Sequence, residues 1–331
     1  MFDILISENV TGAAVDALTS RFTVERIPDL WKTPEALIER VSNCRALIVR
    51  NQTQVTEQVL AAGKRLVVIG RAGIGLDNIN VDAASKSGVI VTFAPEQNAI
   101  SVAELCIGLM LSLARMIPAA NSDTKSGGWN RQMFVGTELY GKTLGIIGAG
   151  RIGCLTAKRA QSFGMKVIAY DPFINVDSVA FSELNGELVD LEELLNRADI
   201  VSCHVPATPQ TRGLLDRKRL QQMKGTALLI NTSRGEIVNE SDLVDALKNR
   251  TIAGAALDVR SGEPPAVDEL EEFPNVVLTP HIAAFTHEAQ TRVVRAVCED
   301  VAAVLEGRQA RNAVNGWVRQ KQRISDGQDP R

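Results

Sequence analysis

Three side chains in the second half of the sequence have the types needed to move a proton at an anionic substrate. Arg234 lies in "INTSRGEIVNE", Glu263 in "LDVRSGEPP" and His281 in "LTPHIAAF". Each follows a run of residues typical of a buried strand, and ligands gather at the carboxyl ends of strands in open α/β sheets. We therefore expect the three side chains to lie at the same edge of one sheet.

Together these three groups suit acid–base chemistry. An imidazole can take up and return a proton near neutral pH, and a carboxylate on its other ring nitrogen fixes the tautomer. A guanidinium can hold a substrate carboxylate and polarise a neighbouring oxygen. Taken singly, each residue has another interpretation: a structural histidine, an arginine in a surface turn, and a glutamate in a solvated loop before two prolines.

A glycine-rich stretch stands well upstream of this trio. Gly148, Gly150 and Gly153 form G-x-G-x-x-G between the strand pattern "TLGII" and a helical pattern. In such a motif the first glycine permits a tight turn, the second a close approach of the backbone to a pyrophosphate, and the third close helix packing. The alternative is an ordinary glycine-rich turn, because the motif alone is weakly specific.

An acid residue at the end of the next strand pattern strengthens the nucleotide interpretation. Asp171 follows "KVIAY", about 20 residues after the glycines, where a carboxylate binds the ribose hydroxyls of NAD and repels the 2′-phosphate of NADP. The alternative for Asp171 is a simple Asp-Pro turn. With NAD as hydride acceptor, the trio predicts the oxidation of a 2-hydroxy acid, in which His281 takes the hydroxyl proton.

These side chains must be positioned by strands and helices that alternate along the chain. We expect an α/β protein with two doubly wound, Rossmann-like or flavodoxin-like parallel sheets. The NAD-binding domain (98–284) is predicted to be inserted into a discontinuous substrate-binding domain (1–97 and 285–331), and a substrate site is expected in a cleft where two such domains meet. The expected strands lie in "DILIS", "ALIVR", "RLVVIGRAG", "GVIVTFAP", "TLGIIGAG", "KVIAYD", "IVSCHVP", "TALLINTS", "GAALDV" and "NVVLTPH".

Helical patterns cover about 98–117 and about 288–305, and a polar, glycine-rich stretch over 121–142 is expected to be a connection. The tail after Arg319 is polar and is expected to fray.

Composition excludes several other classes. The formal net charge of −3 argues against a nucleic-acid or membrane binder. Five scattered cysteines without a C-x-x-C pair predict buried free thiols, with neither a disulfide framework nor a metal site. The start "MFDILISENV" has no secretory pattern and the apolar stretch 105–114 is too short to span a bilayer. We therefore expect a cytoplasmic protein.

At this point the chain resembles the D-isomer-specific 2-hydroxyacid dehydrogenases, and within them the members that oxidise 3-phosphoglycerate. The resemblance rests on "RAGIGLDNIN", "VGTELYGKTLGIIGAGRIG", "SFGMKVIAYDP" and "HIAAFTHEAQ". It implies the inserted NAD domain and the catalytic roles of Arg234, Glu263 and His281. It also implies NAD contacts beyond Gly148, Gly150, Gly153 and Asp171, namely from Arg151, Ile152, Val205, Thr232, Ser233, Asp258, His281 and Ala283.

The resemblance further implies substrate residues in the first segment. The loop formed by Arg71, Ala72, Gly73, Ile74 and Gly75 is expected to offer backbone N–H groups to the substrate carboxylate, with Arg50 at the far end of the substrate. A homodimer or homotetramer is implied, with dimer contacts in "GGWNRQMF". The sequence ends soon after its last helix, so we expect no ACT-type regulatory domain.

Several positions depart from the family pattern, which leaves the substrate open. Asn51, Ile74, Arg260, Ala283 and Phe285 replace the residues that are common there, Arg260 standing where phenylalanine is frequent. The first hypothesis is oxidation of 3-phosphoglycerate to 3-phosphohydroxypyruvate in serine synthesis. The alternatives are a glyoxylate or hydroxypyruvate reductase, a dehydrogenase of another anionic 2-hydroxy acid such as a sulfonate, and a non-enzymatic, corepressor-like NAD sensor.

Overall fold

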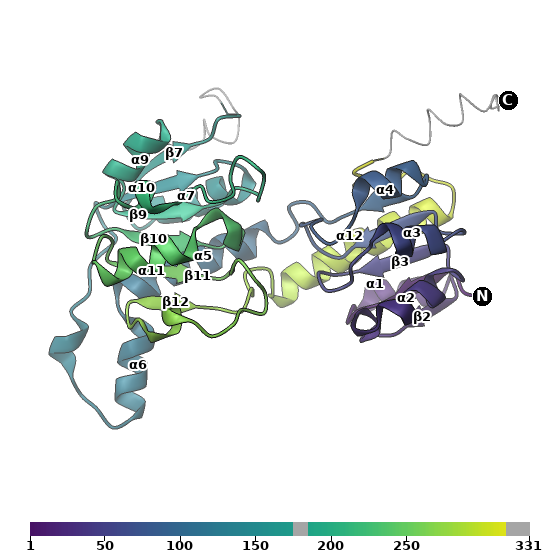
Figure 1. Cartoon of the computed structure of the whole chain (residues 1–331), viewed down its shortest axis with the longest axis horizontal. Coiled ribbons are helices and arrows are strands. Elements are labelled where there is room, and N and C mark those ends of the chain that lie inside the picture. Colours follow the sequence, from purple (N-terminus) through teal and green to yellow (C-terminus); the bar gives the residue numbers. More distant parts are fainter. Residues whose placement is uncertain (175–184, 316–331) are drawn as a thin grey trace. The chain divides into compact units, whose positions relative to one another are not determined.

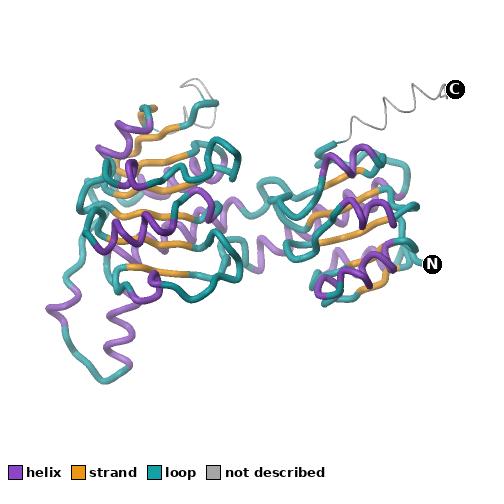
Figure 2. The backbone as a smooth tube through the Cα atoms, in the orientation of Figure 1, coloured by secondary structure: helices purple, strands orange, loops and turns teal. Residues whose placement is uncertain are grey.

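The computed structural model describes residues 1–174 and 185–315. Its contacts divide the chain into two compact units, one made of Met1–Asn98 with the segment from Thr286 onward, the other of Ala99–Phe285. Each unit has its own parallel sheet, drawn in orange in Figure 2. The α/β class with two parallel, doubly wound sheets is thereby confirmed. The polar tail after Arg319 lies outside the described residues.

The sheet of the first unit is short-stranded and buried. Its strand order is β2-β1-β3-β4-β5, with every pair parallel. Runs such as Ile-Leu-Ile and Ala-Leu-Ile-Val are apolar throughout because helices cover both faces of the sheet. The strands are β1 (Ile4–Ile6), β2 (Val24–Arg26), β3 (Ala46–Val49), β4 (Val68–Arg71) and β5 (Ile90–Thr92).

Alternate strand residues of this unit face two different cores. Ile4 and Ile6 belong to the core under α1 and α12, whereas Leu5 belongs to the core under α2, α3 and α4. Gly70 lets α12 lie close to β4, because a Cβ there would fall 2.6 Å from Val297 Cγ1. The helices are α1 (Ala13–Thr19), η1 (Leu30–Lys32), α2 (Pro34–Val41), α3 (Glu57–Ala62), α4 (Val81–Lys86) and α12 (His287–Leu305).

Helix α12 is the last described helix of the chain, and it belongs to the same unit as the first strands. It contacts α1 and β4, and in Figure 1 it lies in yellow-green among the purple and blue elements of the same unit. The first unit is therefore discontinuous in sequence, and the second unit is formed by the residues that intervene.

The sheet of the second unit has seven strands in the order β12-β11-β10-β9-β6-β7-β8, and every pair is parallel. The order reverses at β6 and β9, so this sheet has its topological switch point between those two strands. The strands are β6 (Thr143–Ile147), β7 (Lys166–Tyr170), β8 (Glu187–Leu188), β9 (Ile200–Cys203), β10 (Leu228–Asn231), β11 (Gly254–Leu257) and β12 (Val276–Leu278).

Two sets of helices cover this second sheet. Apolar residues of α5 and α7 share one core with one face of the strands, and residues of α9, α10 and α11 share the other. Gly145 of β6 makes room for α9, because its Cβ would lie 2.6 Å from Leu194 Cδ2. The helices are α5 (Ala99–Ala114), α6 (Ile117–Lys125), η2 (Arg131–Phe134), α7 (Arg151–Gln161), α9 (Leu191–Arg197), α10 (Arg217–Leu220), η3 (Gly235–Ile237), α11 (Glu240–Lys248) and η4 (Glu269–Glu272).

The structure differs from the prediction where a connection was expected. Helix α6 occupies part of 121–142, and η2 follows it. Helix α6 has Pro118 in its first turn, where proline is well tolerated. Strands β2 and β8 were not predicted either; β2 is only partly buried and β8 has two residues, so neither leaves a clear apolar pattern.

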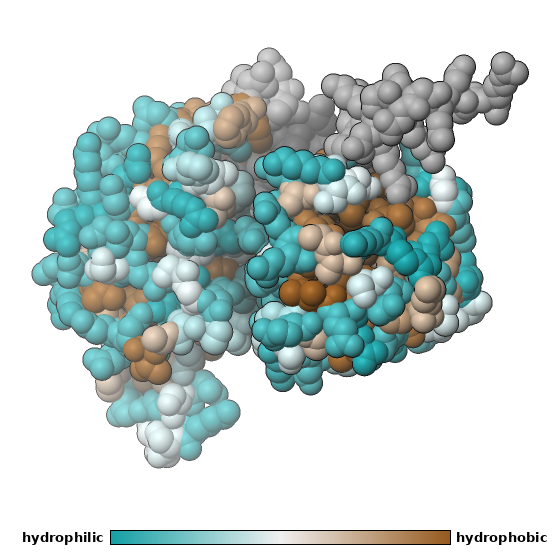
Figure 3. Space-filling view, turned by 45° about the vertical axis from the view of Figure 1, so that its right-hand side comes forward, coloured by the Kyte–Doolittle hydropathy of each residue, from teal (hydrophilic) through white to brown (hydrophobic). Residues whose placement is uncertain are grey.

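Both units present many hydrophilic residues in the view of Figure 3, with hydrophobic patches among them. Within residues 1–174 and 185–315, no single helix is long and apolar enough to cross a membrane. The pair α5 and α6 reaches that threshold only together, with a bend of 63° between the two helices. Helix α5 has many buried residues and belongs to the core of its unit.

Candidate active site

The three acid–base candidates follow three adjacent strands. Arg234 comes after β10, Glu263 after β11 and His281 after β12, and these strands are neighbours in the sheet. Because all three strands are parallel, their carboxyl ends meet at one edge. The second unit alone therefore carries the whole trio.

His281 and Glu263 form a direct pair. His281 Nδ1 lies 2.7 Å from Glu263 Oε2, with about a third or more of each side chain exposed. Partial burial raises the pKa of Glu263, but the hydrogen bond and charge of His281, the backbone N–H of Arg260 and the charge of Arg234 outweigh it, so this pKa lies below its ordinary value. A carboxylate that stays ionised can hold a proton on Nδ1, which leaves Nε2 as the free acceptor.

The backbone at His281 adopts a conformation that non-glycine residues seldom take. Its φ is 53°, in the left-handed region. The N–H of His281 donates to the carbonyls of Asp258 (2.8 Å) and Thr279 (3.0 Å). The Asp258 carboxylate accepts from Thr279 Oγ1 (2.6 Å), Ile282 N (2.9 Å) and Ala283 N (2.8 Å). These bonds hold the turn that presents the imidazole.

Asp258 was predicted from the family resemblance as a cofactor contact. In the structure it is buried, and its carboxylate already accepts the three hydrogen bonds from 279–283. Its contribution to the geometry of the histidine turn was missed from the sequence. The available signal was its position directly after β11, the strand adjacent to the one that ends before His281.

Arg234 is held by its own loop. Its Nη1 donates to the Ser233 carbonyl (2.7 Å), and its carbonyl accepts from Asn231 Nδ2 (2.8 Å). Its positive charge lowers the pKa of Glu263. The next residue must be a glycine, because a Cβ on Gly235 would lie 1.9 Å from the carbonyl carbon of Arg260.

The glycine-rich turn has the geometry that a dinucleotide requires. Gly148 has φ of 95°, and a Cβ there would meet Val205 Cγ1 at 2.8 Å. A Cβ on Gly153 would lie 2.2 Å from the Gly148 carbonyl oxygen, so α7 packs tightly on the turn. Nothing lies within 4 Å of a Cβ on Gly150, the N-cap of α7, which leaves open space beside the first turn of this helix.

Asp171 lies at the end of β7 and faces this turn. Its Oδ2 accepts from Ala149 N (3.0 Å) and its Oδ1 from Phe173 N (2.9 Å). Each oxygen keeps lone pairs for further donors, such as ribose hydroxyls. The turn lies beside the switch point formed by β6 and β9, where nucleotides bind in open sheets. These residues fit a bound dinucleotide.

The other predicted NAD contacts lie along the same edge of this sheet. Arg151 and Ile152 begin α7, and Val205 follows β9. Thr232 and Ser233 follow β10, and Ala283 lies just after His281. The Thr232 hydroxyl is buried and has no hydrogen-bond partner among the described residues.

The predicted substrate loop of the first unit follows β4. Two of its N–H groups are already used, because Ala72 N donates to the Val49 carbonyl (2.7 Å) and Gly73 N to the Arg71 carbonyl (2.8 Å). Among the described residues, the N–H groups of Ile74 and Gly75 have no acceptor. The binding of an anion by this loop stays a prediction, and the N–H groups of Ile74 and Gly75 are the ones open to it.

Arg50 is held at the end of β3. Its guanidinium contacts Gln290 Oε1 and the Asn9 carbonyl, and burial lowers its pKa although Glu8 opposes this. Glu8 is a buried carboxylate that the sequence reasoning missed. It accepts from the backbone N–H groups of Arg50 (2.7 Å), Gln52 (3.1 Å) and Thr53 (2.9 Å), so it shapes this loop.

The five cysteines are buried and free, as predicted. Within the described residues, no group of three or more His, Cys, Asp or Glu side chains has a geometry suited to a metal ion.

The fold and this edge of the sheet define a class: a nucleotide-binding α/β protein with an Arg–Glu–His trio beside the nucleotide turn. Residues 107–283 match the family described as "D-isomer specific 2-hydroxyacid dehydrogenase, NAD binding domain". The chain belongs to this family, so the predicted family and its NAD-binding domain are confirmed.

Curated relatives include the D-3-phosphoglycerate dehydrogenases of Methanocaldococcus jannaschii (46% identical, covering 95% of this chain and 60% of the relative) and of Synechocystis sp. (43%, 95% and 56%). A solved structure from Thermus thermophilus is 36% identical, covers 94% of this chain and 99% of its own, and has a TM-score of 0.89. The chain therefore spans less than two thirds of the length of these two curated relatives.

Proposed function

We propose that this protein oxidises a D-2-hydroxy acid with NAD, and that the first substrate to consider is 3-phosphoglycerate, which gives 3-phosphohydroxypyruvate. The observation that carries the proposal is the 2.7 Å pair between His281 and Glu263 at the sheet edge that also holds the nucleotide turn. The names of the curated relatives support the choice of substrate.

In this proposal, residues 99–285 form the NAD-binding domain and the remaining unit binds the acid. NAD, when bound, supplies the hydride acceptor. His281 Nε2 takes the proton of the C2 hydroxyl as the C2 hydrogen leaves with its electron pair, and the C2–O bond becomes a carbonyl. Glu263 keeps the proton on Nδ1 and stabilises the imidazolium that forms. Arg234 binds the carboxylate and polarises the C2 oxygen.

The cofactor would be held by the residues of the glycine-rich turn. Backbone N–H groups at the start of α7 would bind the pyrophosphate, and Asp171 would bind the adenosine ribose. The predicted contacts of Arg151, Ile152, Val205, Thr232, Ser233, Asp258 and Ala283 stay predictions. In the other unit, the open N–H groups of Ile74 and Gly75 would bind an acid carboxylate and Arg50 a distal anionic group.

Steady-state assays with a panel of 2-hydroxy and 2-oxo acids test the proposal. We expect NADH formation from D-3-phosphoglycerate and not from its L isomer, because three substituents of C2 have fixed partners in this mechanism: the hydroxyl at His281, the carboxylate at Arg234 and the hydrogen at the nicotinamide. D-glycerate, glyoxylate, hydroxypyruvate and a sulfonated 2-hydroxy acid serve as comparisons. Turnover confined to compounds without phosphate would refute 3-phosphoglycerate as the substrate. It would still agree with the proposal that the protein oxidises a D-2-hydroxy acid. Absence of turnover with every acid would refute the function.

We also propose a homodimer or homotetramer. Its support is the segment after α5, where Trp129, Met133 and Val135 are 78%, 67% and 74% exposed. Large apolar side chains gathered on one surface segment favour association. The cytoplasmic location stays a prediction.

A further inference from the structure

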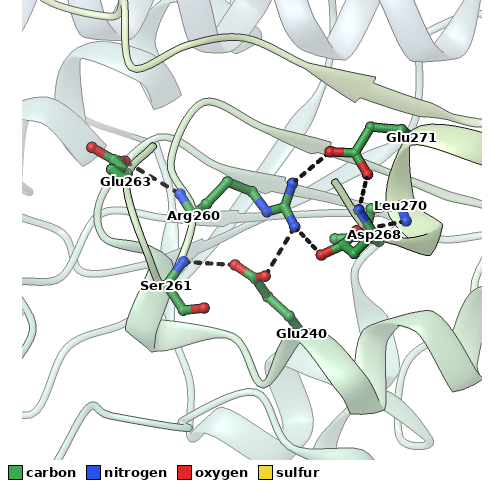
Figure 4. A network of polar contacts seen from close by, with 7 residues as sticks. All are labelled: Glu240, Arg260, Ser261, Glu263, Asp268, Leu270 and Glu271. Atoms are coloured by element: carbon green, nitrogen blue, oxygen red, sulfur yellow. Dashed lines mark hydrogen bonds and ion pairs between the residues drawn. The ribbon is translucent and has the colours of Figure 1, made fainter. Parts of the chain in front are cut away.

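Arg260 stands beside the acid–base pair and has no part in the proposed chemistry. Its side chain is only 7% exposed, and its guanidinium pairs with three carboxylates. Arg260 Nη2 contacts Glu240 Oε2 (3.1 Å) and Asp268, and Nη1 contacts Glu271 Oε1 (3.3 Å). Figure 4 shows the guanidinium between these acids, with Glu263 on the opposite side of the Arg260 backbone.

The three acids come from elements that surround the loop carrying Glu263. Glu240 begins α11, Asp268 is the N-cap of η4, and Glu271 lies within η4. Asp268 and Glu271 also form a capping box, in which Asp268 N donates to Glu271 Oε2 (2.9 Å). The guanidinium therefore ties the two ends of segment 260–268 to α11.

The backbone next to the guanidinium continues this connection to the histidine. Ser261 N donates to Glu240 Oε1 (2.7 Å), so Glu240 binds both the side chain of Arg260 and the following peptide. Arg260 N donates to Glu263 Oε1 (3.3 Å), and the other oxygen of Glu263 contacts His281 Nδ1. Gly235, the neighbour of Arg234, packs on the Arg260 carbonyl.

We propose that Arg260 is a positioning residue, whose buried ion pairs fix the backbone that holds Glu263 against His281. This inference rests on the proposed function, because the pair has a reaction to serve only in a dehydrogenase. The loop is exposed from Ser261 to Glu269. The buried Arg260 side chain, with its three acid partners, restricts the movement of this loop.

The alternative is that Arg260 only stabilises the fold. Removing one partner of a buried ion pair is strongly destabilising in any case, so loss of stability alone does not decide the matter. The deciding variants are Arg260→Ala, Arg260→Lys, and Arg217→Ala as matched control. Arg217 also bridges two acids, Asp242 and Asp245, in the same unit, but its side chain is 61% exposed.

For Arg260→Ala we expect kcat to fall about tenfold in the folded fraction of the protein, since misplacing an acid–base group lowers the rate of the chemical step. The KM for NAD should change little. The acidic limb of the pH profile should move to higher pH, because three uncompensated acids and a loosened Arg260 N–H raise the pKa of Glu263. His281 and Arg234 are the other charged groups that act on Glu263, and the substitution does not alter either residue. Arg260→Lys should restore part of kcat, and Arg217→Ala should match the parent.

A readout without turnover separates this inference from the proposed function. The chain has three histidines, so the ring nitrogens of His281 can be assigned by NMR on histidine-labelled protein with His281→Gln as reference. In the parent we expect the tautomer with the proton on Nδ1, and in Arg260→Ala a mixture of tautomers. If Arg260→Ala does not fold, Glu271→Gln, which keeps an oxygen for Asp268 N, takes its place.

The proposal is overturned if Arg260→Ala keeps both the parent tautomer and the parent acidic limb, even when its stability falls. If the parent shows no turnover but has the proton of His281 on Nδ1, the proposed dehydrogenase function is refuted. The inference that Arg260 positions Glu263 is then unaffected.

Discussion

His281→Ala is expected to lower kcat for the NAD-dependent oxidation about 1,000-fold, since a positioned general base contributes about 10²- to 10⁴-fold. The imidazole is presented by a strained turn and paired with Glu263 at 2.7 Å, so no neighbouring group can replace it at the same place. The affinity for NAD should stay close to that of the parent. Stopped-flow absorbance of NADH and calorimetric titration with NAD measure the two quantities.

The matched control for this variant is His287→Ala. His287 is the first residue of α12, is exposed, and lies outside the proposed site. It should keep the kcat of the parent. If His281→Ala turned over at the parent rate, the acid–base role of His281 would be wrong. If the parent bound NAD without any turnover, the non-enzymatic NAD sensor would become the better interpretation.

Asp171→Asn is expected to lower kcat/KM for NAD about 10- to 100-fold, because a hydrogen bond to a charged acceptor contributes about 1.5–3 kcal/mol. The amide oxygen can still accept one of the two backbone N–H groups that Asp171 binds, from Ala149 or from Phe173, and the other bond is lost. With the negative charge removed, NADP should lose less activity than NAD or gain some, since the 2′-phosphate is no longer repelled. Initial rates with each nucleotide give the ratio.

Asp190→Asn is the control for this change of charge. Asp190 caps α9 in the same unit, and its carboxylate accepts from Glu193 N (2.7 Å), so it has a comparable backbone contact without a place at the nucleotide turn. We expect its NAD to NADP ratio to equal that of the parent. An unchanged ratio in Asp171→Asn would contradict the ribose contact.

The sequence predicted the elements that have strong local patterns. Buried parallel strands are continuous apolar runs, and the structure confirms all ten that were expected. Glycines of the nucleotide turn are also readable, because Gly148 needs a positive φ and Gly153 has no room for a Cβ. The same apolar runs also predicted that Arg234, Glu263 and His281 each follow the end of a strand.

Contacts between distant residues were not readable in this way. Nothing in the sequence says that the Asp258 carboxylate holds the His281 turn, or that Glu8 accepts three N–H groups of the loop after β3. The acids around Arg260 come from two separate parts of the chain, α11 and η4, so only folding brings them together around one guanidinium. Helix α6 was not predicted because none of its residues is buried, so this stretch carries no apolar pattern.

A crystal structure of the protein with NAD and a D-2-hydroxy acid, or its 2-oxo product, tests the central claim most directly. The quantity to measure is the distance from His281 Nε2 to the oxygen on C2. A hydrogen bond of about 2.6–3.2 Å, with Glu263 still on Nδ1, is the result expected of a general base. An imidazole turned away from C2, with another side chain on that oxygen, would contradict the proposed mechanism.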